Sequence, residues 1–258
     1  MSSAEGYLTG RFLQARSDPA RVVLEGFHAL KHAIRFGAAI EAACTPDRAA
    51  MLHLALDLAP DVCDRLRDSV EEVSAATFAG LAPLPPATGV LAIAARPAVD
   101  PAAVLGSSNA APIVLLENPS HPGNLGAVVR VAAAAGAAAV LTTGARDPWQ
   151  PAALRGSAGL HFALPVARVD PLPGTDRPLL AIDPEGEPLT DVLAMHRAIL
   201  AFGSERRGLS PALLASAQRR IAIPMRQGVS SLNLACAVAV VLYAWRQRGR
   251  TKNDRSGG

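Results

Sequence analysis

From residue 112 onward, short apolar runs of strand length alternate with glycine-containing loops and helical stretches. Helices are expected over 126–135 and 231–248. The runs expected to form strands are 112–116, 138–142, 179–182, 198–202 and the shorter 221–224. Strands that alternate with helices favour a mostly parallel sheet. The pattern therefore predicts an α/β domain over residues 112–248.

The first 95 residues predict a smaller α/β unit, near the low end of domain size. Residues 1–20 are polar, and we expect them to be partly ordered at best. Residues 96–111 contain two prolines, two serines and a glycine and predict a linker. The basic tail 249–258 ends in glycines and is expected to be disordered. Strands are expected at 21–24, 40–45 and 90–95, and helices at 25–36 and 47–58.

Composition narrows the classes of function. Aromatic residues make up 4% of the chain, which favours helices packed closely on a sheet over a broad stacking surface for single strands. A net charge of +3 is compatible with a nucleic-acid partner. Cys44, Cys63 and Cys236 are widely spaced and odd in number, so they predict neither a disulfide framework nor a zinc site. We therefore expect a cytoplasmic protein without a bound metal.

Neither the N-terminus nor the apolar runs predict a membrane protein. Residues 1–11 lack the apolar region of a secretory signal. The longest apolar runs, 132–141 and 234–245, fall short of the ~20 residues that span a bilayer.

The segment 117–130 joins an expected strand to a helix that begins near Asn124. Asn124 can cap this helix or present its amide to a ligand. Arg130 stands in a helix that otherwise consists almost wholly of alanine and valine, so it belongs on the buried face only if its charge is paired. Taken alone, the spacing favours a cap and a solvated arginine.

Two later segments also join extended runs to glycine-containing loops. In 200–211, Gly203 allows close approach of a ligand to the backbone, and Glu205 lies just beyond the strand, where open α/β sheets bind ligands. In 223–234, Ser230 or Ser231 can cap a long helix whose free N–H groups can bind a ligand oxygen. Taken alone, the first segment is a weak signal that an ordinary charged turn also gives, and the second favours a simple capped helix.

Together and in this order, the three segments resemble the three motifs of the SpoU (TrmH-like) branch of the SPOUT RNA methyltransferases. The matching positions are Asn124 with Arg130, then residues 203–210, then residues 223–233. A minor element of the branch resembles 157–159 followed by 165–166. The resemblance covers about residues 112–248, and residues 1–95 resemble the L30e-like substrate-binding domain that often precedes it.

Two positions depart from the branch. Arg206 stands where a glycine is common, and Val131 stands where a threonine is common. Neither departure removes a catalytic group, but Arg206 puts the identity of the RNA substrate in doubt.

The resemblance implies a C-terminal α/β trefoil-knot domain with its knot around the second and third motifs. It also implies transfer of a methyl group from S-adenosylmethionine to a ribose 2′-hydroxyl of RNA by a homodimer. Ribosomal RNA is expected before transfer RNA, because an N-terminal domain of this kind favours it. An antibiotic-resistance role is an open alternative.

The resemblance also implies residue roles. Arg130 would stabilise the developing alkoxide as a cation, because a neutral arginine base is expensive, and Glu205 would orient it. The implied catalytic set is Asn124, Arg130, Glu205, Ser231 and Asn233. The implied methyl-donor pocket is Thr142, Gly144, Phe202, Gly203, Ile223, Met225 and Leu232. Candidate RNA-contacting residues are Arg11, Arg16, Arg21, Lys31 and Arg35 in the first unit, and Arg206, Arg207 and Arg226 near the site.

Two other function classes stay open. A non-catalytic RNA-binding or ribosome-assembly protein could keep the knot, although the presence of Arg130, Glu205 and Asn233 argues against this class. A nucleotide-dependent enzyme of Rossmann type is disfavoured because the sequence has neither GxGxxG nor a P-loop lysine.

Overall fold

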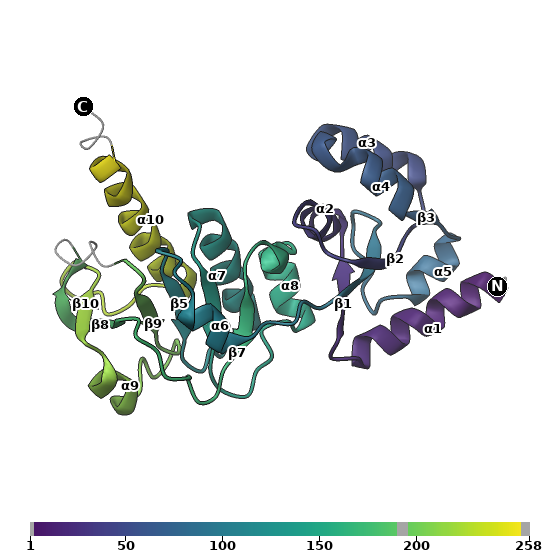
Figure 1. Ribbon diagram of the computed structural model, residues 1–258. Coiled ribbons are helices and arrows are strands. Elements are labelled where there is room, and N and C mark those ends of the chain that lie inside the picture. The colour runs from purple at the N-terminus through teal and green to yellow at the C-terminus, as the bar shows by residue number, and fades with distance from the viewer. Residues whose placement is uncertain (1–2, 190–195, 254–258) are drawn as a thin grey trace. The chain divides into compact units, whose positions relative to one another are not determined.

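The computed structural model describes residues 3–189 and 196–253, which form two compact α/β units (Figure 1). The first unit contains the chain up to residue 98 together with 158–163, and the second contains 99–157 and the chain from 164. The predicted fold class, α/β throughout with a mostly parallel C-terminal sheet, is confirmed. Within the described residues, we find no helix of the length and apolar character that a membrane span requires.

The first unit has a mixed sheet of four strands in the order β1-β4-β2-β3. β4 pairs antiparallel with β1 and β2, and β3 adds a short parallel edge to β2. The strands are β1 (Arg21–Glu25), β2 (Ile40–Thr45), β3 (Glu71–Glu72) and β4 (Leu91–Ala95). The helices are α1 (Ser3–Ser17), α2 (Phe27–Arg35), α3 (Arg48–Leu58), α4 (Cys63–Ser69) and α5 (Ala75–Gly80), with the 3₁₀ turns η1 (Pro60–Val62) and η2 (Leu160–Ala163).

Helix α1 corrects the expectation of partial order over residues 1–20. Phe12 and Ala15 are buried in a core with Phe78 of α5 and Ile93 of β4, and Leu8 packs at its margin. The buried stripe is narrow, because only every third or fourth residue of an otherwise polar helix enters the core. Because the other residues of this segment are polar, the sequence pattern did not predict the helix.

The second unit contains a parallel sheet of six strands in the order β10-β8-β9-β5-β6-β7. The strands are β5 (Ile113–Leu116), β6 (Ala139–Thr142), β7 (Val166–Arg168), β8 (Leu179–Pro188), β9 (Ile199–Phe202) and β10 (Arg219–Ala222). The helices are α6 (Pro101–Gly106), α7 (Pro122–Ala135), α8 (Pro151–Ser157), α9 (Pro211–Ser216) and α10 (Leu234–Asn253).

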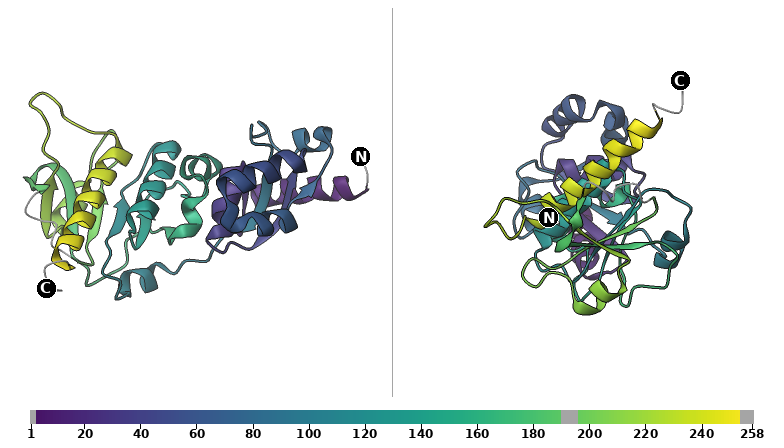
Figure 2. Two further views of the ribbon diagram at one scale, coloured as in Figure 1. Left: turned by 90° about the horizontal axis from the view of Figure 1, so that it is seen from above. Right: turned by 90° about the vertical axis from the view of Figure 1, so that its left-hand side faces the viewer.

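Helices cover both faces of this sheet. Alternate strand residues such as Ile113 and Leu115 form one buried cluster with Leu105 of α6, and the half-buried Leu213 of α9 packs against it. On the other side, α7 packs against both α8 and α10 (Figure 2). A sheet buried on both faces explains why these strands are continuous apolar runs.

Several element bounds differ from the predicted ones. A short helix, α6, lies within the stretch predicted to be a linker, with Asp100 as its N-cap. Helix α7 begins at Pro122, so Asn124 lies in its first turn and does not cap it. Helix α10 begins at Leu234 and continues to Asn253, into the stretch predicted to be disordered; residues 254–258 lie outside the described residues. The knot stays a prediction from the family resemblance.

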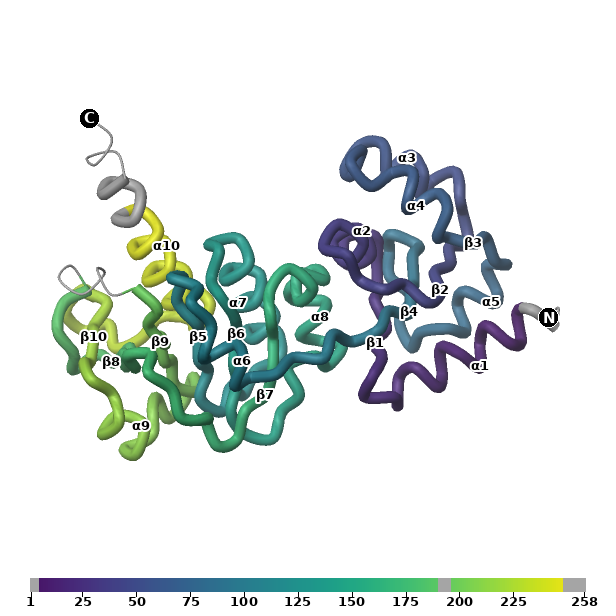
Figure 3. The backbone as a smooth tube through the Cα atoms, viewed as in Figure 1, coloured from purple at the N-terminus to yellow at the C-terminus, as the bar shows by residue number. Residues whose placement is uncertain are grey.

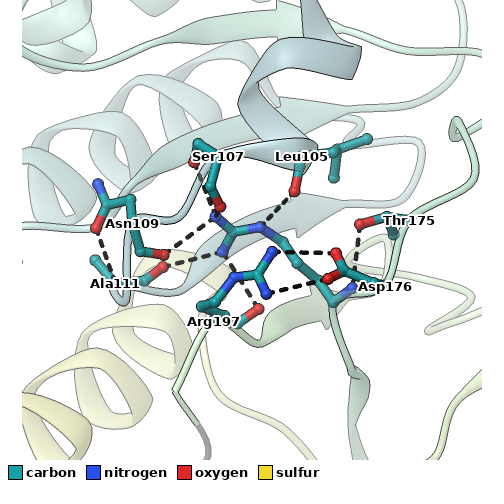
Figure 4. Close-up of polar contacts among 8 residues, drawn as sticks. Leu105, Ser107, Asn109, Ala111, Thr175, Asp176 and Arg197 are labelled. Carbon is teal, nitrogen blue, oxygen red and sulfur yellow. Dashed lines mark hydrogen bonds and ion pairs between the residues drawn. The ribbon is translucent and has the colours of Figure 1, made fainter.

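The buried Arg177 anchors the segment of the chain that leads into the second sheet. Arg177 is 2% exposed, and its guanidinium donates to the backbone carbonyls of Leu105, Ser107, Asn109, Ala111 and Arg197 at 2.8–3.3 Å. Figure 4 shows these residues: Leu105 lies at the end of α6, Ser107, Asn109 and Ala111 follow it, and Arg197 lies just before β9. Buried polar groups need such partners, so Arg177 ties the segment before β5 to the sheet.

Candidate functional site

Three strands of the second sheet, β5, β6 and β9, end on one row, and β8 crosses this row at Ile182 before it continues to Pro188. Leu116 of β5 pairs with Thr142 of β6 and with Phe202 of β9, and Phe202 pairs with Ile182 of β8. The loops that follow these parallel strands therefore start at the same carboxyl edge, which is where open α/β sheets bind ligands.

Glu205 joins two of these loops. Its carboxylate accepts hydrogen bonds from the backbone N–H of Ser120 at 3.1 Å, from Ser120 Oγ at 2.5 Å and from Asn124 Nδ2 at 2.9 Å. Ser120 and Asn124 flank the start of α7, whereas Glu205 follows β9. One carboxylate thus holds the first and second predicted motifs together.

The third predicted motif is attached to the same group through two amides. Asn233 Nδ2 donates to Asn124 Oδ1 at 3.1 Å, and Asn233 Oδ1 accepts from the backbone N–H of Ala235 at 2.9 Å. Asn233, not Ser230 or Ser231, therefore satisfies the N–H at the start of α10. We call the chain of hydrogen bonds Ala235–Asn233–Asn124–Glu205 the amide relay.

The amide relay keeps Glu205 ionised. Burial of this side chain opposes ionisation, but the hydrogen bonds from Ser120 and Asn124 outweigh it and lower its pKa to about 2. A carboxylate with so low a pKa is a weak proton acceptor at neutral pH. Glu205 can therefore supply a fixed negative charge and hydrogen-bond acceptors, but it is a poor general base.

A second carboxylate, Glu117, was not singled out from the sequence. It accepts from both the backbone N–H and the Oγ of Ser210, each at 2.6 Å. Ser210 in turn caps α9 by accepting from the N–H of Leu213. The position of Glu117, directly after β5, is the signal that could have identified it.

The loop after β9 folds into a tight turn. The backbone N–H of Ser204 donates to the carbonyl of Gly208 at 3.1 Å, and the N–H of Gly208 donates to the carbonyl of Ser204 at 2.9 Å. A Cβ atom at Gly203 would lie 2.0 Å from the carbonyl carbon of Gly208. Only glycine at 203 permits this close return of the chain.

A cavity of about 410 Å³ opens beside this turn. Its size lies within the range of about 300–1,000 Å³ of small-molecule sites. It is lined by Ile182, Asp183, Pro184, Phe202, Gly203, Ser204, Glu205, Arg206, Gly208, Ile223, Met225, Ser230, Ser231, Leu232, Leu234 and Ala237. All of them belong to the second unit, and they combine apolar side chains with a few polar groups.

Most of the residues predicted to form the site come together here. Five of the predicted methyl-donor residues line the cavity: Phe202, Gly203, Ile223, Met225 and Leu232. Of the predicted catalytic set, Glu205 and Ser231 also line it, while Asn124 and Asn233 reach it through the amide relay.

Besides Asn124 and Asn233, three predicted residues lie outside this lining. Thr142 is fully buried, and its Oγ1 has no hydrogen-bond partner in the described structure. Gly144 has a φ of +83° and is in close contact with Asn118, where an added Cβ would lie 2.5 Å from Asn118 Oδ1. Arg130 is exposed, and we find no hydrogen bond or ion pair for it within the described ranges. The expected contact between Glu205 and Arg130 is therefore replaced by contacts with Ser120 and Asn124.

Sequence reasoning missed the cavity residues contributed by β8. Ile182 and Asp183 line the cavity because β8 lies next to β9 in the sheet. The order of strands could not be read from the sequence, so this neighbour was not assigned. We find no cluster of three or more potential metal ligands in the described part of the chain.

Comparison with known proteins places this geometry in a family. Residues 111–243 match the model of the SpoU rRNA Methylase family. A 23S rRNA (uridine(2479)-2′-O)-methyltransferase from Streptomyces viridochromogenes is 36% identical over 156 residues, which cover 54% of each chain. The chain thus spans about half the length of the curated relatives it matches.

Solved structures extend the similarity to both units. A crystal structure described as an RNA 2′-O ribose methyltransferase has a TM-score of 0.72 and 29% identity, covering 97% of each chain. The SpoU methyltransferase AviRb from Streptomyces viridochromogenes, in complex with AdoMet, has a TM-score of 0.75, covers 95% of this chain and 99% of its own, and shares the fold at 22% identity. Since the family model matches more than half of the 258 residues, the chain belongs to the SpoU rRNA methylase family.

Proposed function

We propose that this chain is an S-adenosylmethionine-dependent methyltransferase that acts on a ribose 2′-hydroxyl of RNA. The observation that carries the proposal is the convergence of three separated loops, joined by the amide relay, on one cavity. Two relatives, named as a 23S rRNA 2′-O-methyltransferase and an RNA 2′-O ribose methyltransferase, support the same reaction.

The residues of the cavity fit the proposed methyl donor. S-adenosylmethionine supplies a methyl group on a positively charged sulfonium. The apolar side chains of Phe202, Ile223 and Leu232 would hold its flat adenine ring, and the open backbone at Gly203 would allow close contact. Glu205 and Asp183 contribute carboxylates to the lining, which suits a cationic ligand.

The remaining roles concern the attacking hydroxyl. Because the pKa of Glu205 is about 2, its carboxylate would hold the loops in place and leave the hydroxyl's proton to another acceptor. Arg130 would stabilise the developing alkoxide with the positive charge of its guanidinium. Ser231, in the lining, would position the ribose or the methyl donor. Positioning of two reactants alone is worth up to about 7–11 kcal/mol.

The RNA is proposed to be ribosomal, because both the family description and the 23S rRNA relative name that class. The unpaired guanidinium groups of Arg206, Arg207 and Arg226 would bind its phosphates, since we find no carboxylate partner for them among the described residues. A cytoplasmic location follows from the same proposal.

A homodimer is proposed as the working form. Val240 and Tyr243 of α10 are 42% and 43% exposed, so this helix offers apolar surface that a second copy would cover. Arg130 lies on the neighbouring helix α7, outside the cavity of its own chain. A dimer through α10 would explain both facts if the active site needs residues of two protomers.

The test is transfer of a radiolabelled methyl group from S-adenosylmethionine to total RNA taken from cells that lack the gene. Ribose 2′-O-methylation mapped by mass spectrometry should appear with the wild-type protein. It should be lost with Gly203→Ala, whose Cβ has no room beside Gly208. When the two inactive variants Gly203→Ala and Arg130→Ala are mixed, part of the activity should return only if each active site combines residues of both protomers. Methyl-donor binding without transfer would favour the non-catalytic alternative.

A further inference from the structure

A groove of about 670 Å³ lies in the first unit, between α1 and the sheet. Helix α1 contributes Tyr7, Gly10, Arg11 and Gln14 to the lining of the groove. These residues follow the three- and four-residue spacing of one helix face. From the strands it takes Arg21, Glu41 and Ile93. The groove therefore has one helical wall and one sheet wall, and its volume lies in the range of small-ligand sites.

Helix α1 is held in a way that leaves this wall open. Phe12 and Ala15 are 1% and 2% exposed and anchor in the core the helix α1, which leads into β1 (Figure 3). Ala15 also borders the groove, and Gly10, Arg11 and Gln14 line it beside this anchor. A Cβ built on Gly10 would have no heavy atom within 4 Å. The groove beside α1 is thus open at Gly10, which has no side chain to fill it.

The wall carries a flat aromatic platform. Tyr7 is 71% exposed in a chain with few aromatic residues. The guanidinium carbon of Arg11 lies 5.9 Å from the centre of the Tyr7 ring, and Arg11 Nη2 donates to the backbone carbonyl of Glu41 at 2.9 Å. Aromatic rings and arginine planes are the surfaces on which unpaired nucleobases stack.

The charges of the groove disfavour a phosphate. Arg21 Nε donates to Glu41 at 2.8 Å and its guanidinium also pairs with Asp18, while Arg11 lies 3.9 Å from the Glu41 carboxylate. Two arginines are thus balanced by two carboxylates. The side chain of Gln14 has no partner in the described part of the chain and can both donate to and accept from a base edge.

We propose that this groove binds an unpaired nucleobase of an RNA, stacked on Tyr7, with its polar edge bonded to Gln14. The choice of RNA as the partner rests on the proposed function. The site would let the first unit select RNA with an exposed base near the segment to be methylated. A continuous duplex offers no such base, so it would not occupy the groove.

Fluorescently labelled RNA oligonucleotides about ten nucleotides long test the proposal, as random single strands and as a duplex of equal length. Tyr7→Ala in the full chain should weaken single-strand binding by about 5- to 150-fold, the range of one base–aromatic stack. Tyr7→Phe keeps the ring and should bind nearly as well as the wild type. Leu13→Ala is the matched control, because Leu13 is 64% exposed on the same helix and does not line the groove.

Gly10→Leu provides a second variant that does not remove a contact. Leucine fits the open space, favours the helix over glycine and would fill the groove. We expect a loss of single-strand binding similar to that of Tyr7→Ala, without a fall in unfolding temperature.

Equal affinities of the wild type, Tyr7→Ala and Gly10→Leu for single strands would overturn the proposal, as would Tyr7-dependent binding of the duplex. A protein ligand in the groove would also leave the RNA affinities unchanged and so count against it. Failure of the proposed function is a separate result, since wild type that transfers no methyl group can still show Tyr7-dependent binding of single strands.

Discussion

Replacement of Glu205 by glutamine should break the amide relay, because the direction of every hydrogen bond in it is fixed. Ser120 presents its N–H and Oγ to one carboxylate oxygen, so the glutamine oxygen must take that place. Its NH₂ group then faces Asn124 Nδ2, and two hydrogen-bond donors meet.

Rotation of the amides cannot repair this conflict. If Asn124 turns, its Nδ2 faces Asn233 Nδ2; if Asn233 turns as well, its Nδ2 faces the N–H of Ala235. The backbone N–H at the end of the relay cannot become an acceptor. Each rotation therefore moves the conflict one step and never removes it.

The magnitude follows from the bond that is lost. A hydrogen bond to a charged group is worth about 1.5–3 kcal/mol. For a domain of this size, 1 kcal/mol shifts the unfolding temperature by about 2–4 °C, so Glu205→Gln should lower it by about 3–12 °C. Both tryptophans, Trp149 and Trp245, belong to the second unit, so tryptophan fluorescence reports its unfolding. Glu185→Gln is the control with the same charge change, because Glu185 is exposed.

The double variant Glu205→Gln/Asn124→Asp gives the decisive comparison. An aspartate at position 124 can accept both from the NH₂ group of the glutamine introduced at position 205 and from Asn233 Nδ2, so every hydrogen bond and the net charge are restored. We expect the double variant to regain most of the lost stability, with a coupling energy of about 1–3 kcal/mol. Losses that simply add, to within about 0.5 kcal/mol, would refute the fixed direction of the relay.

Three further predictions test other parts of the structure. The wild type should be more stable than Glu205→Gln by an amount that is fully present above the ordinary glutamate pKa of 4.5. This difference should shrink as the pH falls toward about 2, because folding lowers the pKa of Glu205. Urea unfolding at several pH values measures the difference, and a difference that does not change with pH would contradict the prediction. Arg177→Met should cost more than about 3 kcal/mol in urea unfolding, because several buried carbonyls lose their hydrogen-bond donor, and a change near zero would count against this role. Thr142→Val should be neutral or stabilise by up to about 1–2 kcal/mol, because the buried Oγ1 has no partner; a loss of methyl-donor affinity measured by calorimetry would instead show that the hydroxyl contacts that ligand.

The apolar strands could be predicted because burial on both faces leaves a continuous apolar run. The expected strands 112–116 and 138–142 each differ by one residue from the fully buried β5 and β6. Helix α1 could not be predicted, because its anchor is a few apolar residues that recur on one face of a polar segment. Arg177 also gave no signal, since an arginine satisfied by carbonyls looks in the sequence like any surface arginine.

The composition of the site was predictable, whereas its contacts were not. Loops after parallel strands meet at one edge, so the strand pattern predicted Glu205 there, and the family resemblance implied Ser231 and Phe202 at the same cavity. Which side chain meets which depends on the path of each loop. Glu205 therefore contacts Ser120 and Asn124, and the pairing with Arg130 that the family resemblance implied is not formed in the described structure.

The chemistry of the amide relay explains why each of its residues has the type it has. The relay begins at the backbone N–H of Ala235, so the side chain at position 233 must accept a hydrogen bond. The same side chain must also donate one to the side chain at position 124. Only an amide such as Asn233 or Asn124 does both in a fixed direction. The last group must accept from an amide and from both donors of Ser120, which requires two acceptor oxygens and hence an ionised carboxylate. The low pKa of Glu205 is therefore a consequence of the relay's direction, and any substitution that reverses one step must be matched by a reversal at the next.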